Sequence, residues 1–245
     1  MTTNNIPFSQ PTVARVSIII VTYNAAAHLQ KCLDSIYAQR YPAIDIIVID
    51  GASTDGTVEI IQSNAQRLAY WVSEKDEGIY DAMNKGLDHV TGDWIYFLGS
   101  DDVLLPEFSD MITRLDDADT IYYGNVMFGD LKRWGPLKPY YMAKYGIYHQ
   151  SIFYPKSVFE NYKYNTHYKI TADNVLNMQL YKDKRYRYAH LDFLICDYSP
   201  FGISGTQVDT VFEKERLRLI YANFGIAVWF RYWFKRMKAK VRGNK

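Results

Sequence analysis

Two adjacent carboxylates, Asp101 and Asp102, follow the apolar run 94–98 after a two-residue turn. A charged carboxylate next to such a run is costly to bury unless it is paired or bound to a metal. Magnesium is typically held by one or two carboxylates together with substrate phosphates. The pair therefore indicates a Mg²⁺ or Mn²⁺ site that neutralises a diphosphate leaving group, although capping of the turn before Pro106 remains the simpler alternative.

Polar clusters also follow three earlier apolar runs, at residues 16–21, 44–49 and 68–72. The first two are rich in Val and Ile, as buried parallel strands are. Each cluster alone is explained by a turn or a helix cap. Four of them at successive strand ends make that explanation incomplete, because ligands of open parallel sheets bind at the carboxyl ends of the strands.

Helical patterns separate these runs. Leu29, Leu33 and Ile36 share one helical face, and we expect Asn24 to cap that helix. A second face begins at Ile79 and Met83. Alternating strands and helices predict an α/β fold with a mostly parallel sheet.

The second half of the chain has a different pattern. Residues 120–128 and 187–198 are expected to be strands, and residues 175–181 a helix. No linker or internal repeat separates the halves, so we expect the second half to pack on the first.

Four segments in order carry a family resemblance: 22–24 (Thr-Tyr-Asn), 50–57 (Asp-Gly-Ala-Ser-Thr-Asp-Gly-Thr), 81–86 (Asp-Ala-Met-Asn-Lys-Gly) and 92–102 (Gly-Asp-Trp-Ile-Tyr-Phe-Leu-Gly-Ser-Asp-Asp). Over roughly residues 16–200 the chain resembles glycosyltransferase family 2, and is most similar to bacterial members that build exopolysaccharide or O-antigen repeat units. The resemblance implies a GT-A (Rossmann-like) fold, with a mixed, mostly parallel central sheet flanked by helices. It also implies inverting transfer of a sugar from a nucleotide-sugar, by expectation a UDP-sugar, to a glycan or a polyprenyl-diphosphate-linked acceptor.

The resemblance implies roles for single residues. Thr22, Tyr23 and Asp50 would hold the base and ribose, with Asp50 at the uracil edge, and the loop 74–78 would lie along the donor. The full expected donor set is Thr22, Tyr23, Asn24, Asp50, Asp76, Asp81, Ser100 and Asp101. Gly99 replaces the first Asp of the usual Asp-x-Asp signature, which weakens the expected cation site at Asp101 and Asp102.

A catalytic carboxylate is expected downstream. The matching residue is Asp173, which would take the proton of the acceptor hydroxyl as a general base. Capping of the following helix is the alternative. His149 and Gln150 would contact the acceptor or the diphosphate, with a purely structural histidine as the alternative. Residues 202–205 resemble a loop that closes over the donor.

Composition narrows the remaining possibilities. The net charge is +1, which predicts no general attraction to nucleic acid. Cys32 and Cys196 are far apart in apolar settings and are expected to be reduced core residues. The start of the chain, residues 1–11, lacks the pattern of a signal peptide, so a cytoplasmic protein is expected.

The end of the chain is basic and aromatic. A helical wheel places Phe230, Trp233, Phe234, Met237 and Val241 on one face. The basic residues beside it are Arg231, Lys235, Lys238 and Arg242. Such a helix suits an anionic membrane surface, so we expect peripheral attachment to the cytoplasmic face of the inner membrane. A helix docked on the domain with a solvated basic face is the alternative.

The expected organisation is a glycosyltransferase domain over residues 1–205 and a helical tail over residues 206–245. The domain would divide into a donor half, about 14–105, and an acceptor half, about 106–205. An inactive nucleotide-sugar or glycan-binding protein is the main alternative function, and Gly99 is the feature that favours it.

Overall fold

A computed structural model of the protein describes residues 13–133, 135–199 and 207–243. The first half forms the parallel part of the central sheet. Its strands are β1 (Val16–Thr22), β2 (Ile44–Asp50), β3 (Tyr70–Ser73) and β4 (Trp94–Gly99), in the order β3-β2-β1-β4. All neighbouring pairs among these four strands are parallel, as the sequence pattern predicts.

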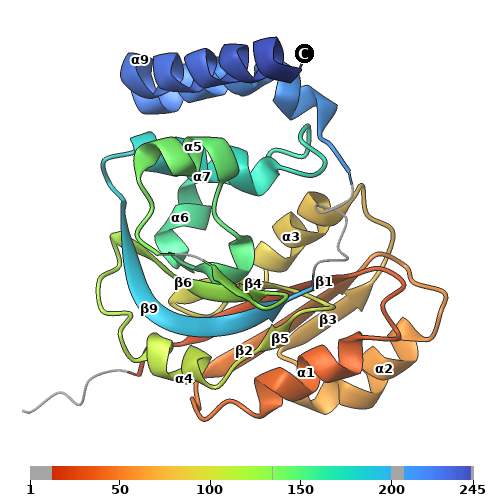
Figure 1. Ribbon diagram of the computed structural model, residues 1–245. Coiled ribbons are helices and arrows are strands. Elements are labelled where there is room, and N and C mark those ends of the chain that lie inside the picture. The colour runs from red at the N-terminus through yellow and green to blue at the C-terminus, as the bar shows by residue number, and fades with distance from the viewer. Residues whose placement is uncertain (1–12, 134, 200–206, 244–245) are drawn as a thin grey trace, which may run out of the picture.

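Helices cover both faces of this sheet (Figure 1). Helices α1 (Leu29–Tyr37) and α2 (Thr57–Asn64) lie on one face, and α3 (Ile79–Leu87) lies on the other. Successive side chains of β1 point to opposite faces of the sheet. Ile18 packs in the core with α1, whereas Ile19 packs in the core with α3. The 3₁₀ turn η1 (Ala65–Arg67) leads from α2 towards β3.

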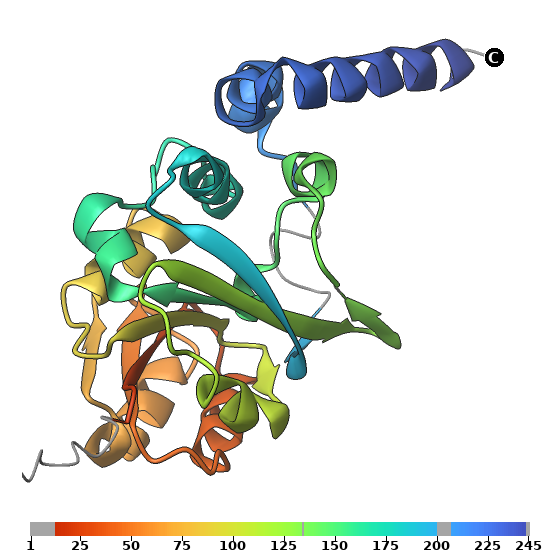
Figure 2. The same cartoon turned by 90° about the vertical axis from the view of Figure 1, so that its left-hand side faces the viewer.

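The second half extends the same sheet. Strand β8 (Ile152–Pro155) joins β4 in antiparallel fashion, β6 (Thr120–Phe128) follows it, and β9 (Arg187–Tyr198) lies parallel to β6. The described residues form a nine-stranded sheet, and the long curved β9 crosses it in Figure 2. The remaining elements of this half are β5 (Val103–Leu104), α4 (Glu107–Ile112), β7 (Leu131–Arg133), α5 (Pro139–Tyr145), η2 (His149–Ser151), α6 (Lys156–Asn161) and α7 (Ala172–Lys182).

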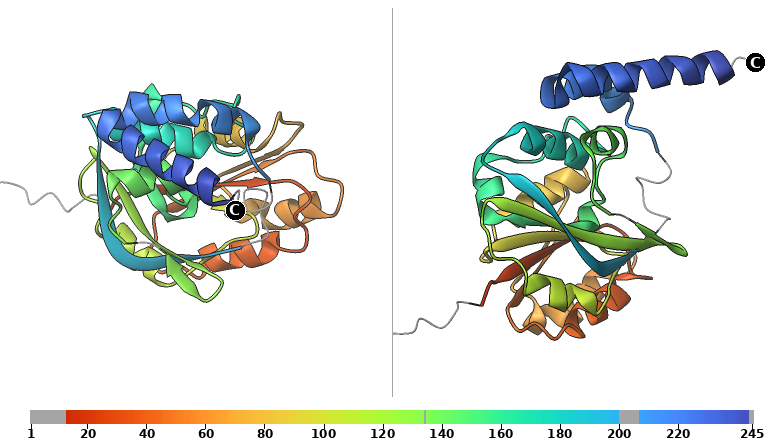
Figure 3. Two further views of the ribbon diagram at one scale, coloured as in Figure 1. Left: turned by 45° about the horizontal axis from the view of Figure 1, so that its top comes forward. Right: turned by 60° about the vertical axis from the view of Figure 1, so that its left-hand side comes forward.

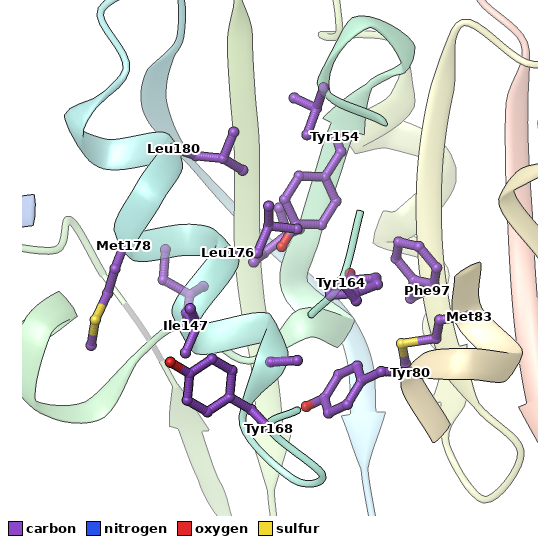
Figure 4. Close-up of a cluster of buried hydrophobic side chains, with 14 of the residues drawn as sticks. Tyr80, Met83, Phe97, Ile147, Tyr154, Tyr164, Tyr168, Leu176, Met178 and Leu180 are labelled. Atoms are coloured by element: carbon purple, nitrogen blue, oxygen red, sulfur yellow. The ribbon is translucent and has the colours of Figure 1, made fainter. Parts of the chain in front are cut away.

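A buried cluster joins the two halves on the α3 face. Figure 4 shows Tyr80 and Met83 of α3 facing Leu176 of α7, with Tyr164 and Phe97 between them. The ring of Tyr164 lies 5.3 Å from that of Tyr80 and 5.3 Å from that of Phe97. This packing holds the N-terminal end of α7 close to the start of α3.

The tail forms helix α9 (Thr210–Gly243), which is interrupted at Gly225. Gly225 has φ 78°, in the left-handed region that glycine adopts readily, and α9 therefore consists of two limbs that meet at an angle (Figure 3). Both α5 and α7 contact α9, which lies over the second half of the chain. No helix among the described residues is long and apolar enough to cross a membrane.

Candidate active site

The register of the parallel strands brings the polar strand ends together. Thr22 pairs with Asp50, Asp50 pairs with Ser73, and Val21 pairs with Gly99. Four segments that are distant in sequence therefore end at one edge of the sheet. The expected donor residues of β1, β2 and β4 share this edge.

Asp50 is completely buried, and its own loop surrounds it. Its Oδ2 accepts hydrogen bonds from the backbone N–H of Ser53 at 2.9 Å and from the hydroxyl of Ser73 at 2.6 Å. Its Oδ1 accepts the hydroxyl of Ser53. The carboxylate thus fixes the loop after β2 against β3.

The end of β1 carries the buried hydroxyl of Thr22, and the exposed ring of Tyr23 follows it. Tyr23 is 67% exposed, whereas Thr22 is buried and its hydroxyl has no hydrogen-bond partner among the described residues. An unpartnered buried hydroxyl at a strand end is costly, and a ligand polar group would satisfy it.

The expectation that Asn24 caps α1 is wrong. That helix begins at Leu29, and its N-cap residue is His28. Asn24 has φ 50°, and its Oδ1 accepts the N–H of Thr54 at 3.0 Å. Its role is to join the loop after β1 to the loop after β2, since Asn tolerates the left-handed conformation.

The loop after β3 lies close to these residues. A Cβ added to Gly51 would lie 2.6 Å from Oδ2 of Asp76 and 3.3 Å from the ring of Tyr23. Only a glycine therefore lets Asp76 and Tyr23 approach the same backbone. The loop is stiffened by Asp76, which accepts the N–H of Gly78 at 2.8 Å, and by Asp81, which accepts the N–H of Glu77 at 3.1 Å.

Gly99 begins a tight turn that folds Asp102 back onto it. The N–H of Asp102 donates to the carbonyl of Gly99 at 3.1 Å, and a Cβ at Gly99 would lie 2.5 Å from Oδ2 of Asp102. The same Cβ would lie 3.1 Å from Oδ1 of Asp101. The glycine that departs from the family signature is therefore required by the position of Asp102.

Asp102 is 1% exposed and accepts three hydrogen bonds from described residues. Its Oδ2 accepts from the N–H of Gly99 at 3.2 Å and from Nε2 of Gln150 at 2.8 Å, and its Oδ1 accepts the N–H of Ser199 at 2.9 Å. Burial raises the pKa of Asp102, and the bonds from Ser199 and Gln150 lower it in part. Asp101 and Ser100 beside it are half-buried.

Asp173 lies at the start of α7, where the cluster shown in Figure 4 packs against α3. The N-cap residue of that helix is Thr171, so the capping alternative for Asp173 is wrong. Oδ1 of Asp173 is 2.7 Å from the hydroxyl of Tyr80, and Oδ2 is 3.7 Å from Nδ1 of His149. The side chains of His149 and Asp173 are only 17% and 12% exposed.

The pair His149–Gln150 connects the two groups of carboxylates. His149 approaches Asp173, and Gln150 binds Asp102. The structure thereby brings an expected cation residue and the expected base to adjacent residues of η2. Residues 202–205, the expected closing loop, lie outside the described residues, as do the 205/206 boundary and the start of the chain.

Sequence reasoning did not identify Tyr80, Ser53 or Ser73. Tyr80 falls between Ile79 and the Asp81 segment and looks like one more apolar-face residue of α3. Its buried hydroxyl near a carboxylate becomes visible only when α3 and α7 are packed together. Ser53 lies within the 50–57 segment that carries the family resemblance, and this position could have suggested that it binds Asp50.

The fold and site define a class of protein. The crystal structure of S. aureus TarS 1-349 in complex with UDP superimposes with a TM-score of 0.65 at 19% identity, covering 85% of this chain. Mannosyltransferase PcManGT from Pyrobaculum calidifontis, in complex with GDP-Man and Mn2+, gives a TM-score of 0.60 at 21% identity over 88% of this chain. This chain spans 65% and 64% of those two chains. The fold is the GT-A fold of glycosyltransferases.

Sequence comparison identifies the family. The family model for glycosyl transferase family 2 matches residues 17–193, and the chain belongs to this family. The PGL/p-HBAD biosynthesis glycosyltransferase of Mycobacterium bovis (strain BCG / Pasteur 1173P2) is 35% identical over 210 residues, which are 81% of this chain and 82% of that protein. The expected enzyme class, a glycosyltransferase, is confirmed.

Proposed function

We propose that the protein is an inverting glycosyltransferase in which Asp173 is the general base. One observation carries this proposal: a 3.7 Å gap separates Oδ2 of Asp173 from Nδ1 of His149, and both groups are nearly buried. The gap is too long for a direct hydrogen bond, but a hydroxyl oxygen placed beside the line that joins the two atoms reaches both at about 2.8 Å. The acceptor hydroxyl would occupy this position.

The proposed reaction is a single displacement. The acceptor oxygen forms a bond to the anomeric carbon, its proton passes to Asp173, and the bond from the anomeric carbon to the nucleoside diphosphate breaks. Attack from the side opposite the leaving group inverts the anomeric configuration. A base is needed because a neutral hydroxyl is a poor nucleophile until its proton is accepted.

The donor is proposed to be a UDP-sugar. Tyr23 offers an exposed ring for the base, and the hydroxyl of Thr22 lacks a partner among the described residues. Asp50 would support the nucleobase site indirectly, because its carboxylate oxygens already accept hydrogen bonds from Ser53 and Ser73. The remaining proposed donor contacts are Asn24, Asp76, Asp81, Ser100 and Asp101. Complexes named with UDP, UDP-GlcNAc and GDP-Man exist for proteins of the same fold, which supports a nucleotide-sugar in general.

A divalent cation fits this site only in part. No three His, Cys, Asp or Glu side chains in the described parts of the chain form a group that could hold a metal. Asp101 accepts no hydrogen bond from a described residue, whereas Asp102 already accepts three. We propose that Asp101, with a lesser contribution from Asp102, would hold Mg²⁺ or Mn²⁺ together with donor phosphates, in the pattern that suits magnesium. When bound, the cation would neutralise charge on the leaving diphosphate.

The tail is proposed to bind the inner-membrane surface next to a polyprenyl-diphosphate-linked or glycan acceptor. Phe230, Phe234 and Met237 of α9 are 55%, 55% and 44% exposed. Exposed aromatic and basic residues on one helix favour an anionic bilayer surface. Two of the expected basic residues are partly used within the protein, because Arg231 and Lys235 lie 4.1 Å and 5.0 Å from the ring centre of Tyr140.

This arrangement supports a peripheral enzyme of bacterial surface-polysaccharide synthesis on the cytoplasmic face of the inner membrane. The proposed organisation keeps a donor half, about 14–105, an acceptor half, about 106–205, and the tail from 206. An inactive nucleotide-sugar or glycan-binding protein is the second candidate. The three hydrogen bonds that described residues donate to Asp102 favour this second candidate, because they leave fewer carboxylate lone pairs free to bind a cation.

The test is a thermal-shift panel of UDP, GDP, dTDP and CMP, each with and without Mn²⁺, followed by donor turnover. A ligand that binds only the native state raises apparent stability by mass action. Stabilisation by UDP that Mn²⁺ deepens, with release of UDP from a UDP-sugar, supports the enzyme and its cation. Stabilisation without turnover of any donor supports the binding protein. No stabilisation by any nucleotide contradicts both.

A further inference from the structure

Tyr80 makes a short contact with the proposed base from inside the core. It is the second residue of α3 and 5% exposed, and it lies 93 positions before Asp173 in the sequence. Its hydroxyl oxygen is 2.7 Å from Oδ1 of Asp173 and 2.7 Å from the carbonyl oxygen of Ile170. Figure 4 shows the hydroxyl of Tyr80 pointing away from α3 towards the side of the cluster formed by α7 and Tyr168.

The two contacts of Tyr80 depend on the proton of Asp173. A phenol has one hydrogen and can also accept, whereas an ionised carboxylate and a carbonyl can only accept. Burial and the nearby charge of Asp173 raise the pKa of Tyr80 well above its ordinary value, so Tyr80 stays neutral. With Asp173 ionised, the single hydrogen serves one of two acceptors. A proton on Oδ1 would let Asp173 donate to Tyr80 and Tyr80 donate to Ile170, whereas a proton on Oδ2 leaves Oδ1 an acceptor for the hydroxyl of Tyr80.

The surrounding groups hold this arrangement in place. The N–H of Ile170 donates to Asp209 at 3.0 Å, and the N–H of Phe212 donates to the same carboxylate at 3.1 Å. Ile170 is therefore bonded through its carbonyl to α3 and through its N–H to the residue before α9. The rotation of the Asp173 carboxylate is limited on the Tyr80 side, and Oδ2 is the oxygen that faces His149.

We propose that Tyr80 is a positioning residue for the transfer reaction. It fixes Oδ1 of Asp173 so that Oδ2 meets the acceptor hydroxyl and takes up its proton. This inference rests on the proposed function, in which Asp173 is the base. Tyr80 itself touches neither donor nor acceptor in this proposal.

The variant Tyr80→Phe removes the hydroxyl and keeps the ring. Tyr164→Phe is the matched control, because Tyr164 is buried beside Tyr80 but makes no hydrogen bond to Asp173. The assay follows nucleoside diphosphate release from UDP-glucose, UDP-galactose, UDP-GlcNAc and GDP-mannose with water as acceptor, using the donor that the unaltered protein turns over fastest. Steady-state kcat and donor KM are measured for each variant, alone and combined with Asp173→Asn.

A misplaced base lowers kcat without weakening donor binding. We expect Tyr80→Phe to lower kcat by about 10- to 100-fold and to leave donor KM within about twofold, because small errors in the position of a catalytic group cost rates of this order. Tyr164→Phe should keep kcat within about threefold, and Tyr80→Phe should add little further loss to Asp173→Asn, since the two residues act as one unit.

Three results would overturn the inference, and they are distinguishable. Unchanged kcat in Tyr80→Phe, with Asp173→Asn inactive, sinks the role of Tyr80 alone. The role of Tyr80 also fails if Tyr80→Phe lowers kcat by the same factor in the Asp173→Asn background as in the unaltered protein. Tyr80 would then act independently of the carboxylate. Full activity of Asp173→Asn, or no turnover of any donor by the unaltered protein, overturns the proposed function together with the inference.

Discussion

Gln150 donates from Nε2 to Oδ2 of Asp102 at 2.8 Å, and both side chains are buried. The next residue towards the N-terminus, His149, approaches Asp173. One short turn thus contacts a carboxylate of the proposed cation site and the carboxylate of the proposed base. The consequences can be measured one at a time.

Gln150→Leu should destabilise the protein by about 1–3 kcal/mol, because a buried ionised group loses a donor. Burial already raises the pKa of Asp102, and the bond from Gln150 lowers it, so the variant raises it further. A raised folded-state pKa means that stability falls as pH rises above the ordinary value of 3.8. The deficit of Gln150→Leu should therefore be larger at pH 8 than at pH 4, which is close to that ordinary value. Urea unfolding at both pH values measures it, and exposed Gln179→Leu is the control. An equal deficit at both pH values would contradict this role.

Asp173→Asn should lower the transfer rate by at least about 100-fold, since an amide cannot accept the proton. Affinity for UDP, measured by calorimetry, should be unchanged because the base acts on the acceptor. Asp110→Asn, an exposed carboxylate of α4, is the control. Weakened UDP binding in Asp173→Asn would assign the residue to the donor side instead.

Gly99→Asp restores the usual family residue, yet it should harm the protein. The new Cβ would lie 2.5 Å from Oδ2 of Asp102 and would bring a third carboxylate to the turn. We expect a loss of about 1–3 kcal/mol in the free energy of unfolding, the ordinary cost of overpacking. Gly135→Asp is the control, because a Cβ at Gly135 meets nothing within 4 Å. A Gly99→Asp variant as stable as the unaltered protein would show that Asp102 moves easily.

Both cysteines should resist modification in the native protein. Burial raises the pKa of the Cys32 and Cys196 thiols well above the ordinary 9.0, so little reactive thiolate exists at pH 8. A thiol titration with a chromogenic disulfide should count both groups in urea and react far more slowly without it. Rapid reaction of either thiol in the native state would contradict the buried positions.

Phe230→Ser with Phe234→Ser should weaken binding to phosphatidylglycerol vesicles by about tenfold or more, the effect expected from losing two apolar anchors. Deleting the tail from residue 229 is a poorer test. Tyr232 is 8% exposed within the core cluster, so a deletion would also disturb the fold. Leu131→Ser, an exposed apolar residue of β7, is the control. Equal sedimentation of the double variant and the control would remove the membrane role of these residues.

The polar edge of the parallel sheet could be predicted from the sequence. Parallel strands end at a common edge, so polar residues after β1, β2 and β4 had to meet there. The contacts of Gln150 with Asp102 and of Tyr80 with Asp173 could not be predicted, because they join residues 48 and 93 positions apart through the packing of separate elements. The role of Asn24 was predicted wrongly, since its side chain serves a neighbouring loop instead of a helix end.

The carboxylate of Asp209 has a consequence for how the chain can be divided. It accepts the N–H of Ile170, three residues before Asp173, and the N–H of Phe212 in the first turn of α9. The loop that leads to the proposed base and the start of the tail are thus bonded to the same two oxygens. A shortened protein that ends before Asp209 would lose a support of the proposed reaction centre along with the proposed membrane-binding tail.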